Sequence, residues 1–226
     1  FQVERFKARQ LEKGYAAATV RIHLSCLSRA LRCAVAWKLI DENPVANVEL
    51  PTADNRREVF LDGDEIDRFL AAAEGKWKAL FTVAVRTGMR QGEILALRWE
   101  DIDFKRKVIQ VRHSLYKGKL GSAKTRTSAR RIPIAALDLE AALMGRSFGR
   151  NGEFVFHDGQ GQPLTKEALR KPLRQALKDA GNDKPVTFHD LRHTFAAMCA
   201  MRGMDVATLQ GMLGHADLRM VMRYVH

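Results

Sequence analysis

Hydrophobic residues recur at three- and four-residue steps near the start of the chain, as in a helix with one buried face. Four residues form this stripe: Leu24, Leu27, Leu31 and Val35. Thr19 is a candidate N-cap for the helix. The segment DENPVANVELP (41–51) then ends the pattern, because the residue before a proline disfavours helix. The mixed charges of 50–59 indicate a linker.

A second helical region begins with LDGDEIDRFLAAA. Asp62, followed three residues later by Glu65, has the spacing of a capping box at a helix start. The apolar segment WKALFTVAVRTG is predicted to form a helix that ends at Gly88. The segment RQGEILALRW (90–99) is predicted to form another helix.

Two segments rich in β-branched residues are the best strand candidates, KVIQVRH (107–113) and RRIPI (130–134). The polar, basic segment between them (114–129) is predicted to be a loop. Helical periodicity dominates over 165–181 and again after Phe188. The predicted fold is therefore mainly α with one small antiparallel β-sheet, an α+β class.

Charge is the compositional feature that narrows the function. The 226 residues include 38 Lys and Arg against 26 Asp and Glu, which gives a net charge of +12 and a pI near 10.0. Such a field attracts polyanions, so nucleic acid is the leading partner, and a merely basic solvated surface is the alternative. No apolar run approaches the ~18 residues of a membrane span. The three cysteines lack CxxC spacing, which favours packing in a reducing compartment over disulfides or zinc.

The segment TFHDLRHTF (187–195) carries the most unusual side chains. Its helix would turn an apolar stripe to the core: Leu191, Phe195 and Met198. His189, Arg192 and His193 fall on another face, above Ala196 and Ala200, whose small side chains would leave room for an approaching group.

Three interpretations of this face compete. A metal site would use the i, i+4 pair His189 and His193, but Arg192 between them would repel a dication. Half-buried structural histidines explain Arg192 poorly, since guanidinium groups are rarely buried without a partner. A phosphate site suits Arg192, because arginine is a permanently charged, planar donor.

Companions for a phosphate site occur elsewhere in the chain. Arg90 follows Gly88 at a predicted helix start, where backbone N–H groups also favour an anion. Glu93 lies one turn further and could orient Arg90. Three more candidates follow along the chain: Lys124, His215 and Tyr224.

Together these motifs resemble the catalytic region of a tyrosine recombinase of the phage integrase family. The family's arginine in TGxRxxE matches Arg90, and its lysine before an RxIPL-like strand matches Lys124. Its HxxR motif matches His189 and Arg192. Its LGH and RYxH motifs match the remaining two positions: His215 and Tyr224.

The resemblance implies a domain organisation and an activity. A helical core-binding, DNA-binding domain would cover 1–50, N-terminally incomplete because the chain begins at Phe1, followed by a linker at 51–57 and a catalytic domain at 58–226. The activity would be site-specific cleavage and rejoining of DNA through a 3′-phosphotyrosyl intermediate. The alternatives are a DNA-binding protein of the same fold without cleavage, or a type IB topoisomerase-like enzyme.

Each candidate residue has an expected role. Arg90 and Arg192 would clamp the phosphate oxygens, with Glu93 supporting them, and Tyr224 would be the nucleophile. Lys124 would act as general acid and His189 would accept the tyrosine proton. His215 would hydrogen-bond the phosphate or support the tyrosine. Four further arginines are expected on the surface or on the DNA backbone: Arg86, Arg98, Arg130 and Arg131.

The resemblance also implies partners and a location. Double-stranded DNA would be the substrate, bound by a homotetramer on paired sites, with accessory DNA-bending proteins as further partners. No metal or other cofactor is expected, because exchange of equivalent phosphodiester bonds needs no fuel. The protein would act in the cytoplasm, at the bacterial nucleoid or as a phage product in its host, and no membrane association is expected.

Overall fold

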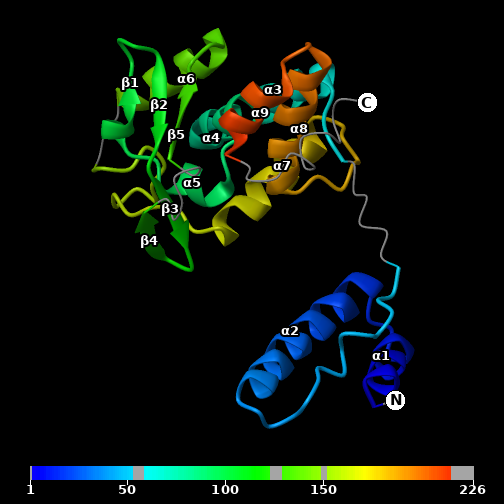
Figure 1. The fold of residues 1–226 in the computed structure, drawn as a ribbon. Coiled ribbons are helices and arrows are strands. Elements are labelled where there is room, and N and C mark those ends of the chain that lie inside the picture. Colours follow the sequence, from blue (N-terminus) through cyan, green and yellow to red (C-terminus); the bar gives the residue numbers. More distant parts are fainter. Residues whose placement is uncertain (1, 53–58, 123–128, 149–151, 215–226) are drawn as a thin grey trace. The chain divides into compact units, whose positions relative to one another are not determined.

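The computed structural model describes residues 2–52, 59–122, 129–148 and 152–214. The chain divides into two compact units, Phe1–Glu58 and Val59–His226, each of which is described by itself (Figure 1).

The N-terminal unit is a helical pair, α1 (Gln2–Glu12) and α2 (Ala17–Ala36). Its small core is built from four buried side chains: Val3, Val20, Leu24 and Val45. The predicted helix is confirmed, but it begins earlier than expected, with Ala16 at the N-cap position. Thr19 therefore lies inside α2, and its prediction as the N-cap is wrong.

The second unit opens with three of the predicted helices, α3 (Gly63–Ala72), α4 (Gly75–Thr87) and α5 (Gln91–Leu95). The capping box is confirmed, because Asp62 and Glu65 exchange two hydrogen bonds of 2.9 Å. Helix α4 ends at Gly88, whose φ of 60° is left-handed. A Cβ on Gly88 would lie 2.4 Å from the Phe195 ring, so this turn needs glycine. Helix α5 is shorter than predicted.

The strands form two small antiparallel sheets. The first has the order β1-β2-β5, with β1 (Ile102–Asp103), β2 (Val108–Val111) and β5 (Arg130–Pro133), and it pairs Ile109 with Ile132. The second is a hairpin of β3 (His113–Tyr116) and β4 (Lys119–Ser122).

This hairpin corrects the prediction of a loop at 114–129 and of a single sheet. Its two-residue turn has positive φ at both positions, 49° at Lys117 and 74° at Gly118, as hairpin turns require. Lysine is not a usual residue for that conformation. Leu115 is buried and pairs across the hairpin with Leu120.

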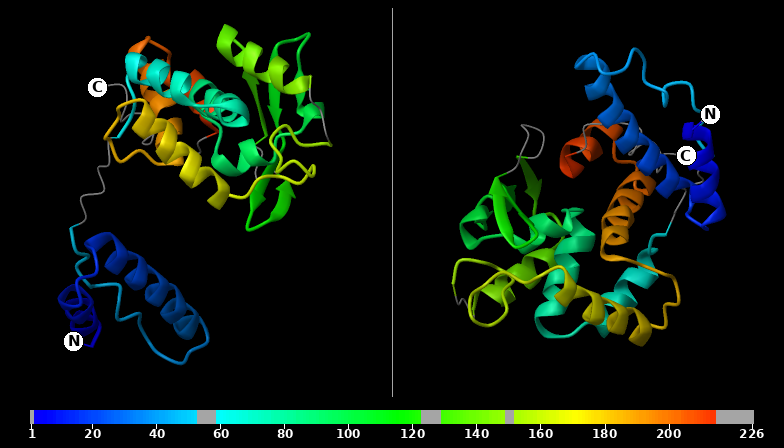
Figure 2. Two further views of the ribbon diagram at one scale, coloured as in Figure 1. Left: turned by 180° about the vertical axis from the view of Figure 1, so that it is seen from behind. Right: turned by 90° about the horizontal axis from the view of Figure 1, so that it is seen from below.

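The remaining helices complete the unit: η1 (Trp99–Asp101), α6 (Leu137–Ser147), η2 (Glu167–Leu169), α7 (Arg170–Asp179), α8 (Phe188–Met201) and α9 (Val206–Leu213). Helix α6 has no counterpart among the predicted elements. Helix α4 lies at the centre, in contact with α3, α5, α6 and α8. The strands lie to one side of it and α3, α7, α8 and α9 to the other, as both views in Figure 2 show.

The predicted fold class, mainly helical with small antiparallel sheets, is confirmed. The main apolar core of the second unit includes the fully buried side chains of Phe69, Phe81 and Phe156, and a smaller apolar cluster lies between α8 and α9. None of the helices in the described ranges is both long and apolar enough to cross a membrane.

Candidate active site

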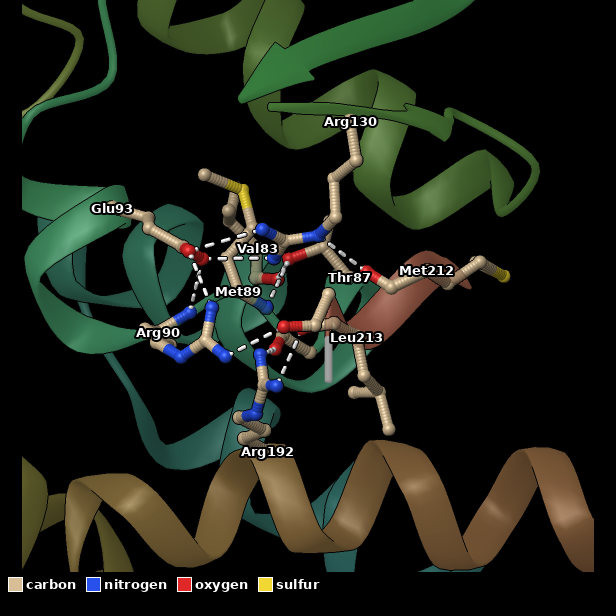
Figure 3. Close-up of polar contacts among 11 residues, drawn as sticks. Val83, Thr87, Met89, Arg90, Glu93, Arg130, Arg192, Met212 and Leu213 are labelled. Atoms are coloured by element: carbon tan, nitrogen blue, oxygen red, sulfur yellow. Dashed lines mark hydrogen bonds and ion pairs between the residues drawn. The ribbon is translucent and has the colours of Figure 1, made fainter. Parts of the chain in front are cut away.

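The turn between α4 and α5 presents Arg90 (Figure 3). The Thr87 hydroxyl donates to the Val83 carbonyl at 2.5 Å and accepts from the Met89 N–H at 3.3 Å, which fixes the turn around Gly88. Arg90 becomes the N-cap residue of α5. Its side chain is 40% exposed, so the guanidinium group can be reached from solvent.

Glu93 holds two arginines from different parts of the chain. Its carboxylate accepts from Arg90 Nη1 at 3.0 Å and from Arg130 Nη1 and Nη2 at 3.0 and 2.8 Å. Burial alone would raise the pKa of Glu93, but the hydrogen bonds and charge of Arg130, with those of Arg90, lower it overall. The carboxylate is therefore ionised at neutral pH.

Arg192 is buried in the first half of α8, with only 4% of its surface exposed. The helix start is fixed by a capping box in which Asp190 accepts from the Thr187 N–H and hydroxyl, both at 2.7 Å. Arg192 donates to the Gly88 carbonyl at 2.6 Å and to the Leu213 carbonyl at 2.5 Å. It thereby connects α8 to the turn before α5 and to the end of α9.

The small alanines on α8 do not leave an open space. Ala196 is 1% exposed and packs with Leu209 and Leu213 of α9. The predicted apolar stripe is confirmed, since Leu191 and Phe195 are buried. The space above Ala196 is therefore filled by a helix of the same chain.

Three consecutive carbonyls at the end of α9 each accept from a different arginine (Figure 3). Arg130 Nε donates to Met212 at 2.5 Å, Arg192 Nη2 to Leu213, and Arg90 Nη2 to Gly214 at 2.8 Å. The last carbonyls of a helix lack intrahelical partners and carry partial negative charge, so cations stabilise them. This helix end gathers three guanidinium groups in one place, which suits the binding of an anion.

His189 and His193 lie beside this arginine cluster. Their ring centroids are 4.7 Å apart and the rings are nearly perpendicular. Partial desolvation lowers the pKa of His189, and the positive charges of His193 and Arg192 lower it further. His189 is thus kept neutral near pH 7 and able to accept a proton. Within the described ranges, no three His, Cys, Asp or Glu side chains are placed to hold a metal ion.

The structure brings together four of the predicted site residues: Arg90, Glu93, His189 and Arg192. Lys124, His215 and Tyr224 lie outside the described residues. Their neighbours are described: β4 and β5 flank the segment of Lys124, and Gly214, with a left-handed φ of 62°, directly precedes His215.

Arg130 is the site residue that the sequence analysis assigned wrongly. It was expected on the surface or on the DNA backbone, yet its side chain is 6% exposed and paired with Glu93. A period of two along RRIPI could have revealed it, because Arg130 shares its strand face with the buried Ile132 and Ile134. Arg86 and Arg98 instead form ion pairs with Asp138 and Glu153.

Comparisons with known proteins decide the family. Residues 59–226 match the Phage integrase family. The chain belongs to the phage integrase family. This confirms the resemblance inferred from the sequence motifs.

Similar proteins include a phage integrase and a bacterial tyrosine recombinase. The chain is 30% identical to the integrase of Salmonella phage P22 over 226 residues, which cover 95% of this chain and 55% of that protein. It is 29% identical to the tyrosine recombinase XerD of Halalkalibacterium halodurans over 228 residues, covering 95% and 73%. The chain thus spans about half the length of the phage P22 integrase.

Solved structures share the fold. The Tn1549 transposon integrase in complex with transposon right end DNA matches with a TM-score of 0.88 and 24% identity, covering 99% of this chain and 79% of that one. A lambda integrase tetramer bound to a Holliday junction matches with a TM-score of 0.75 and 23% identity, covering 99% and 63%.

Proposed function

We propose that this phage integrase family member is a site-specific DNA recombinase, which cleaves and rejoins DNA through a 3′-phosphotyrosyl intermediate. The observation that carries the proposal is the convergence of Arg90 and Arg192 on one helix end, beside the neutral base His189. Two fixed guanidinium groups are suited to the charge that develops on a phosphate oxygen in the transition state.

Cleavage begins when the Tyr224 oxygen attacks the phosphorus and His189 accepts the phenolic proton. The bond to the 5′ oxygen breaks, and Lys124 donates a proton to that oxygen as it leaves. The products are a phosphotyrosyl linkage to the 3′ end and a free 5′-hydroxyl group. Rejoining is the reverse reaction with a 5′-hydroxyl from another strand, and the number of phosphodiester bonds is conserved.

The other predicted residues support these steps. Arg90 and Arg192 bind the non-bridging oxygens, and ionised Glu93 orients Arg90. His215 hydrogen-bonds the phosphate or supports Tyr224. The reaction uses no metal or cofactor in this proposal, so it proceeds in a chelator.

The proposal includes the domain organisation and the partners. Residues 1–50 form a DNA-binding domain, 51–57 a linker and 58–226 the catalytic domain. Double-stranded DNA is the substrate, in keeping with the net charge of +12. The tetramer of lambda integrase on a Holliday junction supports a homotetramer on paired sites. Accessory DNA-bending proteins would assist, and the reaction would take place at the nucleoid or in the cytoplasm of a phage host.

A covalent-trapping assay in chelator tests the proposal. The protein is incubated with nicked duplexes from the DNA around its own gene, so that the short 5′-hydroxyl fragment is lost and the adduct accumulates. We expect a denaturant-resistant adduct with the wild-type protein and none with Tyr224→Phe. The chain has three tyrosines, so Tyr15→Phe and Tyr116→Phe are matched controls that keep the adduct. An adduct that survives in Tyr224→Phe would contradict the assignment.

A further inference from the structure

Arg130 connects three elements of the candidate active site. It extends from β5, forms two hydrogen bonds with Glu93 at the start of α5, and donates to the Met212 carbonyl at the end of α9. The residues Arg130 and Met212 are 82 positions apart in sequence. The sequence segment that contains Tyr224 follows α9. Arg130 therefore connects Glu93, the partner of Arg90, to the helix end from which that segment continues.

We propose that Arg130 is a positioning residue for DNA cleavage, which aims Arg90 through Glu93 and fixes the end of α9. The proposal rests on the recombinase function inferred above. Arg130 does not contact the scissile phosphate in this proposal. It acts through the direction of the Arg90 side chain and through the place from which the chain continues into His215.

The charges around Glu93 explain why a second arginine is needed. The Glu93 carboxylate pairs with Arg90 and Arg130, and Arg192 binds the Leu213 carbonyl at the same helix end. This cluster therefore has three positive charges and one negative charge, which leaves two positive charges for a phosphate. Without Arg130, Glu93 would neutralise Arg90 alone. The carboxylate would then compete with the phosphate for the same guanidinium group.

The geometry also explains why lysine cannot replace Arg130. The guanidinium group uses Nε for Met212 and both Nη atoms for Glu93, so its two ends bind different elements. A lysine has a single ammonium group on a flexible stem and cannot hold this planar arrangement. Arg130→Lys therefore keeps the charge and removes the bridge.

A purely structural role is the rival explanation, because breaking a buried ion pair is strongly destabilising. The test must therefore measure something that loss of stability would not change. A methylphosphonate at the scissile position supplies this readout, because it lacks one negative charge that the arginines neutralise. If Arg130→Lys misorients the Arg90 side chain, the resulting loss in cleavage rate should be smaller on this neutral linkage than on the natural phosphodiester.

The experiment compares single-turnover adduct formation by wild type and Arg130→Lys at saturating DNA, on both linkages and below the unfolding temperature of both proteins. Since a misplacement of 1 Å can cost about 100-fold in rate, we expect a loss on the order of 10- to 100-fold on the phosphodiester. The loss on the methylphosphonate should be smaller. Arg98→Lys, which alters the Arg98–Glu153 ion pair outside the site, is the matched control and should retain wild-type rates.

A double-mutant cycle gives a second readout. If Arg130 acts through Arg90, then Arg90→Lys combined with Arg130→Lys should lose less than the product of the two single losses. Equal losses on the two linkages, or independent losses in the cycle, would overturn the positioning role while leaving the recombinase function intact. A wild-type protein that forms no adduct on either linkage would overturn the recombinase function, and this inference with it.

Discussion

Helices α7 and α8 both carry arginine, and they place it in opposite environments. Helix α7 buries one face through Leu173, Ala176 and Leu177. Its other face exposes four basic residues to solvent: Arg170, Lys171, Arg174 and Lys178. In the described part of the chain, none of these four has an ion-pair partner. Helix α8 instead buries Arg192 against two backbone carbonyls.

The buried and the exposed guanidinium groups are suited to different functions, although they carry the same charge. Removing a guanidinium group from water costs several kcal/mol, which the hydrogen bonds of Arg192 to the Gly88 and Leu213 carbonyls offset. In return Arg192 is held in one direction, as its proposed role in stabilising a transition state requires. Exposed charges stay solvated and mobile, so they are suited to salt-dependent contacts with the DNA backbone.

The largest expected difference between the arginines of α7 and α8 is the effect of their substitution on the rate of adduct formation. Arg192→Lys keeps the charge but removes one of the two carbonyl contacts and the planar fork. We expect the rate of adduct formation at saturating DNA to fall by about 10²–10³-fold, as for the loss of one fixed donor to a developing oxyanion. DNA affinity should change little. Rapid-quench measurement of the adduct gives the rate.

The matched control is Arg174→Lys on α7, which makes the same chemical change at an exposed position. It should leave the rate within twofold or so of wild type, because surface substitutions rarely alter a distant site. A comparable rate loss in both variants would show that burial does not distinguish the two arginines.

The apolar face of α8 and the strands β2 and β5 could be predicted from the sequence, because local periodicity determines them. The 3.6-residue period placed Leu191 and Phe195 in the core, and the β-branched segments became β2 and β5. The glycine after α4 was a reliable stop signal for the same local reason. The family motifs then supplied the candidate site residues.

The contacts of the arginines with α9, and some turns and close approaches of the backbone, could not be predicted from the sequence. The α9 carbonyls that accept from Arg130 and Arg192 lie 82 and 21 residues from those arginines, and no local pattern links them. The β3–β4 hairpin was missed because Lys117, a residue that seldom adopts positive φ, occupies its turn. The close approach of Gly92 to β3 is another distant contact that the sequence does not reveal: a Cβ on Gly92 would lie 2.6 Å from the Leu115 carbonyl.

The second prediction concerns DNA binding by the exposed face of α7. Replacing its four basic residues with glutamine should weaken binding and reduce its salt dependence. Each lost phosphate contact lowers the slope of log K against log salt by about one. The rate of adduct formation at saturating DNA should stay close to wild type. Fluorescence anisotropy at several salt concentrations measures the slope.

A charge-preserving variant is the control for this experiment. In this variant each of the two arginines of the face is replaced by lysine and each of the two lysines by arginine. The net charge of the face is unchanged, although all four side chains differ. Its salt slope should equal that of the wild type. A glutamine variant with an unchanged slope would show that α7 faces away from the DNA.

The smallest expected effect concerns the pH dependence of His189. Its pKa is lowered from 6.5, first by desolvation and then by the charges of His193 and Arg192. A general base works only when it is neutral, so cleavage should persist as pH falls to 6.5 and decline only below it. His193→Gln removes one of the nearby charges. The pKa of His189 should then rise, and the acidic limb of the rate profile should move to higher pH.

Above pH 8 the wild type and His193→Gln should have equal rates, because His189 is neutral in both. His189→Gln is the control for the assignment, since without the base the acidic limb should disappear and the rate should fall at every pH. If the acidic limb of the rate profile moved to lower pH in His193→Gln, His193 would be favouring the protonation of His189. The two histidines would then have to share a proton across their 4.7 Å ring contact rather than repel each other.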